Sequence, residues 1–119
     1  MAFLPAQTNS GLQVGLCMEA AAKGDITALQ KLREDGHPWN TYVCMAAAEQ
    51  GHLEVLQYLR ANNCPWDEWT TWVAAKNRHV EVFKWAIANR CPWSEPAFRE
   101  AKQGGFLTVL TGLPEGEEF

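Results

Sequence analysis

Apolar, small and polar positions recur along this chain with a period of 27 residues. The dipeptide Pro-Trp marks the period, because it occurs at residues 38–39, 65–66 and 92–93. Other positions keep the same spacing, and the clearest sets are Gly24, Gly51 and Gly105; Ala20, Ala47, Ala74 and Ala101; and Leu29, Leu56, Phe83 and Leu110. A period between about 20 and 50 residues is typical of an array in which each repeat is one supersecondary unit. The pattern therefore predicts a repeat array.

Each period contains the signals of two short helices. The first helix should begin after a short polar residue that can accept a backbone N–H of the first turn, and these residues are Asn40, Asp67 and Ser94. Pro96 fits the first turn of its helix, where a missing N–H costs little. The first helix of the second period should end near Gly51, which can adopt the left-handed conformation of a C-terminal cap.

The second helix is clearest between Leu53 and Arg60. Leu53, Leu56 and Leu59 have helical spacing on one face, and the helix should end at residues 62–63 because the proline that follows cannot continue it. Neither helix exceeds about three turns, so each would be only marginally stable alone. We therefore predict an all-α fold, an α-solenoid of about four stacked helix-turn-helix pairs.

The repeats predict a single domain with a short segment at each end. The domain spans residues 13–113, and its units are 13–39, 40–66, 67–93 and 94–113. Residues 1–12 are an N-terminal extension, and residues 114–119 are an acidic tail. Such arrays need polar terminal units. A monomer is expected, but a fragment of a longer array could associate end to end.

The second unit resembles an ankyrin repeat. Residues 47–56, AAEQGHLEVL, are similar to the A-A-x-x-G-H-x-E-V-V core of that family, and His52 stands in the family's histidine position, where the adjacent units have Asp25 and His79. The resemblance extends through four units and weakens at both ends. The unit is about six residues shorter than a usual ankyrin repeat of about 33, and Pro-Trp stands where the family has a projecting β-hairpin. The chain is thus similar to a short, hairpin-less ankyrin variant with Cys-Pro-Trp repeats.

The third unit departs from the pattern at Arg78, which stands where the other units have glycine. We expect an altered turn there, with Asn77 as a substitute for the left-handed residue.

The resemblance implies a binding surface on the first helices, which line the concave side in the ankyrin family. Carried over to this chain, the exposed positions on these helices are Tyr42, Met45, Glu49, Trp69, Trp72, Lys76, Arg99 and Gln103. Trp69 and Trp72 do not recur in other units, as expected of residues that read a specific partner. Aromatic residues, Met and Arg are enriched in interfaces, so the apolar members would anchor a protein or peptide and the charged members would orient it. The alternative is that these side chains lean onto neighbouring hairpins and only cover the stack.

The other tryptophans have a different pattern. Trp39, Trp66 and Trp93 keep the period, and we interpret them as a structural ladder that covers the turn between units. A stripe that stacks on carbohydrate or peptide is the alternative. Trp85 is expected to be half-exposed on the outer helix.

Four cysteines and three histidines raise the question of a metal or catalytic site. No C-x-x-C or H-x-x-H spacing, which would indicate zinc, is present. Cysteines one period apart would lie about 8–10 Å apart, too far for a disulfide, which needs Cα atoms within about 7 Å. The family alignment places all four at small apolar core positions. We therefore expect no metal and no cofactor, and a Cys/His metal or redox site is the remote alternative.

The histidines His52 and His79 begin second helices and are expected to serve the turn. No Ser-His-Asp or Cys-His-carboxylate set can be assembled from the repeat phases, so the chain is not expected to be an enzyme.

Composition narrows the class of partner. A net charge of −4 argues against nucleic acid, because phosphate-binding proteins carry a basic excess. No apolar run approaches the roughly 18 residues that span a bilayer, and the first ten residues lack a secretory signal, so we expect a cytosolic or nuclear location and no membrane contact. The predicted function is an ankyrin-like protein–protein interaction module; the alternative is a structural spacer, or a piece of a longer array, without its own ligand.

Overall fold

The computed structural model describes residues 13–107, and this part of the chain is helical with no β-strand. Its helices are α2 (Val14–Lys23), α3 (Ile26–Glu34), α4 (Thr41–Glu49), α5 (Leu53–Ala61), α6 (Glu68–Lys76), α7 (Val80–Ala88) and α8 (Glu95–Gly104). The predicted all-α class is confirmed. The predicted extension 1–12, the tail 114–119 and most of the second helix of the last unit lie outside the described residues.

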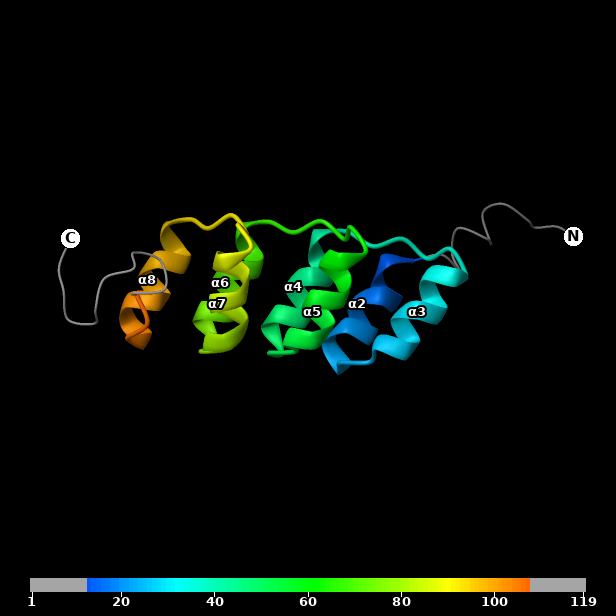
Figure 1. Ribbon diagram of the computed structural model, residues 1–119, viewed down its shortest axis with the longest axis horizontal. Coiled ribbons are helices and arrows are strands. Elements are labelled where there is room, and N and C mark those ends of the chain that lie inside the picture. The colour runs from blue at the N-terminus through cyan, green and yellow to red at the C-terminus, as the bar shows by residue number, and fades with distance from the viewer. Residues whose placement is uncertain (1–12, 108–119) are drawn as a thin grey trace, which may run out of the picture.

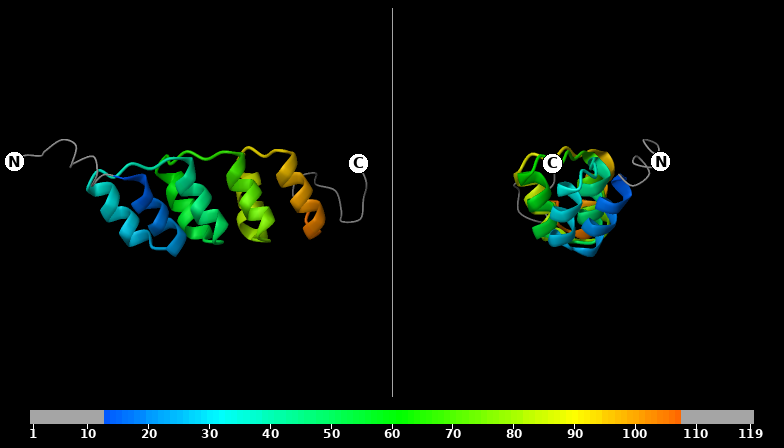
Figure 2. Two further views of the ribbon diagram at one scale, coloured as in Figure 1. Left: turned by 180° about the vertical axis from the view of Figure 1, so that it is seen from behind. Right: turned by 90° about the vertical axis from the view of Figure 1, so that its right-hand side faces the viewer.

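Helices α2 to α7 form a row of antiparallel pairs, and α8 follows at the end of the row (Figure 1). The first helices of successive units, α2, α4, α6 and α8, pack against one another in chain order, and each of α3, α5 and α7 packs against the first helix of its own unit. The short turns within pairs lie along one edge of the row, and the longer connections between pairs run along the opposite edge (Figures 1 and 2). The predicted repetition of a helix-turn-helix unit therefore matches the arrangement in space.

Two of the three predicted N-terminal caps are confirmed. The Asn40 side chain accepts a hydrogen bond from the Tyr42 backbone N–H at 2.9 Å, and the Asp67 side chain accepts one from Trp69 at 3.0 Å. Ser94 occupies the same position before α8, but its side chain makes no capping bond. The reason is that the residue two positions on is Pro96, which has no N–H to donate.

The turn within each pair needs one residue in the left-handed conformation. Gly24 and Gly51 supply it, both with φ of +76°. In the third unit Arg78 itself adopts a φ of +62°, whereas Asn77 has a φ of −94°. The expectation that Asn77 would replace the glycine is wrong, because the backbone keeps the position of the left-handed residue and changes only the side chain that occupies it.

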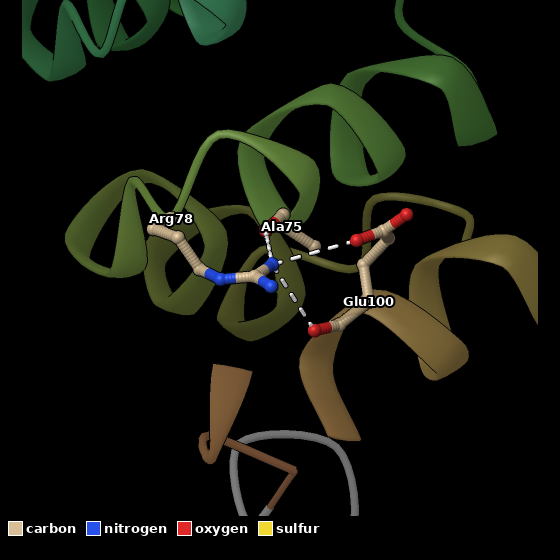
Figure 3. Close-up of polar contacts among 3 residues, drawn as sticks. All are labelled: Ala75, Arg78 and Glu100. Atoms are coloured by element: carbon tan, nitrogen blue, oxygen red, sulfur yellow. Dashed lines mark hydrogen bonds and ion pairs between the residues drawn. The ribbon is translucent and has the colours of Figure 1, made fainter. Parts of the chain in front are cut away.

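Arg78 makes contacts that a glycine could not (Figure 3). Its Nη1 donates to the Ala75 carbonyl at 2.9 Å and lies 3.4 Å from both the backbone oxygen and Oε1 of Glu100 on α8. The strain of a left-handed arginine, roughly 1–2 kcal/mol, is thus offset by hydrogen bonds that tie the third unit to the fourth.

Small residues and cysteines fill the space between the first helices. The alanines at 47, 74 and 101 are fully buried, and their lack of bulk lets adjacent first helices approach closely. All four cysteines are buried and free, as their predicted core positions require. Burial raises the pKa of Cys17, and it raises the pKa of Cys91 to about 12. Contact with the Cys64 thiol, followed by burial, raises the pKa of Cys44. These thiols therefore remain protonated and unreactive at neutral pH.

Candidate functional site

The first helices expose large aromatic side chains on the surface where a partner was predicted to bind. Tyr42 on α4 and Trp69 on α6 are 52% and 46% exposed. They occupy the same repeat position, one unit apart, and α4 packs directly against α6. Neither side chain belongs to the set of apolar residues packed against the core. Both side chains therefore lie on the surface of their helices, outside the hydrophobic core.

The next repeat position is more deeply set. Met45 and Trp72, one helical turn further on, are half-buried and pack against the core. Trp72 meets Trp69 edge to face, with ring centroids 5.2 Å apart and planes at 80°. We call Tyr42, Met45, Trp69 and Trp72 the aromatic patch. It combines two half-buried side chains that pack against the core, Met45 and Trp72, with two exposed rings, Tyr42 and Trp69.

The polar residues predicted around the patch are all exposed. Lys76 lies closest, with its Nζ 4.7 Å from the centre of the Trp72 ring, so a cation already covers part of that ring. Arg99 pairs with Glu95 at 3.3 Å on its own helix α8. Glu49 shares the repeat position of Lys76, and so does Gln103. The patch is thus bordered by charges of both signs at the C-terminal ends of α4 and α6.

The histidines at the start of α5 and α7 were expected to serve the turn, but their side chains make no capping bond and instead contact the preceding unit. In each case Nε2 lies 3.0 Å from a backbone oxygen of the preceding unit, Ala22 for His52 and Glu49 for His79. The Asp25 side chain, at the same position in the first unit, instead caps its own helix through the N–H of Ala28. Within residues 13–107, no group of His, Cys, Asp and Glu side chains is arranged to hold a metal ion.

The three periodic tryptophans differ in their surroundings. Trp39 packs edge-on against Tyr58 of the following unit, and the Arg33 guanidinium lies 4.1 Å over its ring. Trp66 repeats this arrangement with Trp85, and with Arg60 at 4.4 Å. The predicted ladder between units is therefore present at Trp39 and Trp66. Trp93 is 47% exposed and does not belong to the residues packed against the core.

The two arginines of this ladder were not singled out in the sequence. Arg33 and Arg60 are one period apart, and each Nη1 also donates to a backbone carbonyl four residues on, that of His37 and of Cys64, at 2.7 Å. Their shared repeat position was a signal that could have found them, but it recurs only twice, because the third unit has Ile87 there. Trp85 is half-buried, as expected for the outer helix.

Comparisons with known proteins identify no family. No family model matches the chain, and neither a curated protein nor a solved structure matches it. Among the described residues, no helix is long and apolar enough to cross a membrane.

Proposed function

We propose that this protein is a binding module of the ankyrin-like kind, which holds a protein or peptide ligand on the aromatic patch of its first helices. The observation that carries the proposal is the exposure of Tyr42 and Trp69 side by side on adjacent helices. A contiguous apolar patch is rarely kept on the surface of a soluble protein without a use.

The chemistry of the patch suits a peptide with an apolar anchor. Trp, Tyr and Arg dominate the energetics of protein interfaces, and rigid aromatic rings lose little conformational entropy on binding. The charges at Glu49, Lys76 and Arg99 would fix the orientation of the ligand, since electrostatic complementarity contributes mainly to specificity and rate of association. The proposal includes neither catalysis nor a cofactor, and it places the module in the cytosol or nucleus.

The test is selection of peptides from a random library on the immobilised protein, followed by affinity measurements with variants. Trp69→Ala should lower the melting temperature only slightly, because it removes a half-exposed ring and its edge-to-face contact with Trp72, and it should weaken binding of the selected peptides by about tenfold or more. Leu16→Ala is the matched control, since Leu16 is 39% exposed on α2 and lies outside the patch. Peptides that bind the wild type, Trp69→Ala and Tyr42→Ala equally well would refute the proposal.

A further inference from the structure

The corner at Trp93 is an incomplete copy of an arrangement that the molecule completes twice. At Trp39 and at Trp66, an arginine from the preceding helix covers the indole ring and donates to a nearby backbone carbonyl. At Trp93 the corresponding side chain is Ile87, which has no charge and no hydrogen-bond donor for the Cys91 carbonyl. Ile87 packs against the core instead.

The sequence also changes at the position of the second partner of the ladder. Tyr58 and Trp85 pack edge-on against the two earlier tryptophans, whereas the residue one period after Trp85 is Gly112, which has no side chain. Trp93 is 47% exposed, whereas Trp39 and Trp66, each covered by an arginine, are half-buried. The corner thus combines a broad aromatic surface with a backbone carbonyl of the kind that accepts from arginine elsewhere in the fold.

We propose that the Trp93 corner binds an arginine side chain presented by a partner protein or peptide, in the way that Arg33 and Arg60 occupy the two earlier corners. The planar guanidinium suits both contacts at once, since it stacks on an aromatic ring and donates hydrogen bonds in the ring's vicinity. A lysine ammonium makes one contact or the other. The net charge of −4 also favours the approach of a cationic partner.

This site is separate from the aromatic patch. Trp93 lies in the connection between α7 and α8, along the edge where the pairs are joined (Figure 2), and the patch lies on the exposed side of α4 and α6. The nearest arginine along the chain, Arg90, does not stack on Trp93 within the described part of the protein. A partner could therefore occupy the corner without displacing one of these residues.

The experiment follows the indole N–H signal of Trp93 by NMR, assigned through Trp93→Phe, during titration with acetyl-Gly-Arg-Gly-amide. We expect a saturable shift in the millimolar range and binding at least about fivefold weaker for the matched Lys and citrulline peptides. Arg90→Ala should leave the titration unchanged. Equal shifts with the three peptides, or a shift confined to other tryptophans, would overturn the proposal.

A gain-of-contact variant provides the second arm. Ile87→Arg would supply the guanidinium from within the chain, so the folded variant should lose the response to the arginine peptide, whereas Ile87→Leu should retain it. If Ile87→Arg fails to fold, as judged by circular dichroism, Trp93→Ala takes its place, because its exposed side chain can be removed without opening the core. Binding of the arginine peptide by Trp93→Ala with wild-type affinity would contradict the assignment.

Discussion

Thr70 and Thr71 are adjacent in α6, and both side chains are fully buried. The Thr71 hydroxyl donates to the backbone oxygen of Glu68 at 2.9 Å or to that of Pro92 at 2.8 Å. The Thr70 hydroxyl has no hydrogen-bond partner in the described part of the protein, and the equivalent residue of the preceding unit is Val43. Thr70 therefore buries a polar atom at a position that needs only an apolar one.

We predict opposite effects for the same substitution at these two positions. Thr70→Val should raise the free energy of unfolding by about 1 kcal/mol, because it removes an unsatisfied hydroxyl at constant shape. Thr71→Val should lower it by about 1–3 kcal/mol, because it leaves a carbonyl without its donor. Urea unfolding followed by circular dichroism measures both, and a loss of stability in Thr70→Val would contradict the burial described for that hydroxyl.

Substitution of Gly51 and of Gly105 by alanine would distinguish the cost of backbone strain from the cost of a steric contact. Both have a φ near +80°, but a Cβ at Gly51 would lie 2.7 Å from Nδ1 of His79, while a Cβ at Gly105 would meet no atom of the described residues within 4 Å. Gly105→Ala should cost roughly 1–2 kcal/mol from the left-handed backbone alone. Gly51→Ala should cost more, because it also displaces the His79 ring from the Glu49 carbonyl. Equal losses in denaturant unfolding would show that the ring moves away freely.

The raised pKa of Cys91 links stability to alkaline pH. The folded protein holds the thiol proton to about pH 12, whereas the unfolded chain loses it at about pH 8.5. The stabilisation of the folded protein by the protonated Cys91 thiol is therefore complete below about pH 8.5. Above that pH, it should decrease by about 1.4 kcal/mol per pH unit. The free energy of unfolding should be measured at about pH 8 and at about pH 10.5, which lies about two pH units above the thiol pKa of the unfolded chain. The decline between these two pH values should be shallower for Cys91→Ala than for the wild type.

The sequence was a good guide to individual residues where one local interaction decides the outcome. Asn40 and Asp67 are caps because a short acceptor precedes a helix. It failed at Ser94, where a proline two residues later removes the donor, and at Arg78, which keeps the positive φ of the glycine position although it is not a glycine. The outcome depends on a neighbouring residue in the first case and on the backbone conformation of the turn in the second.

At the scale of elements, the corners between units hold helices that are too short to be stable alone. Each complete corner joins the second helix of one unit to that of the next through an arginine, a tryptophan and another aromatic ring. Arg60→Leu should lower the free energy of unfolding by about 1–2 kcal/mol, because it removes the contact with Trp66 and the bond to the Cys64 carbonyl.

Arg99→Leu is the matched control for the corner. Arg99 makes an exposed ion pair within its own helix, and such pairs contribute about 0.5 kcal/mol or less. Thermal melting of the two variants side by side would measure the difference. Similar losses would mean that the corner arginine adds no more than a surface charge.

Helix bounds were well predicted from the period, because polar caps, glycines and prolines act locally. The tertiary role of the corner was predicted only in part. Trp39 and Trp66 recur and are predicted to form a ladder, but the ring that packs against each of them comes from the helix of the next unit, 19 residues further on. A pattern that recurs twice does not stand out in a chain of four units.

At the scale of the whole molecule, the first unit differs from the second in the side chains at the positions that contact a preceding unit. The side chains that reach back to a preceding unit are His52 and Tyr58 in the second unit, and the first unit has Asp25 and Lys31 at these positions. Asp25 instead caps its own helix through the Ala28 N–H, and Lys31 pairs with Asp35 four residues further on.

The partner is the part of the whole that sequence could least predict. Repetition indicates which positions hold the row together, so that the exceptions, such as Trp69, can be picked out. Which ligand an exception binds depends on the shape and charge of a second molecule, and neither is encoded in the period.

The histidine that contacts the preceding unit determines where the row can accommodate an additional unit. A copy of residues 40–66 spliced in after Trp66 would bring both its own His52 and a Glu49 carbonyl for the next unit, so the elongated protein should melt at a higher temperature with more helix by circular dichroism. The same copy placed ahead of residue 13 would be followed by Asp25 and Lys31, which do not make the contacts of His52 and Tyr58. It should therefore lengthen the protein without raising its melting temperature. The molecule should therefore accommodate an added repeat unit between its second and third units more readily than before its first unit.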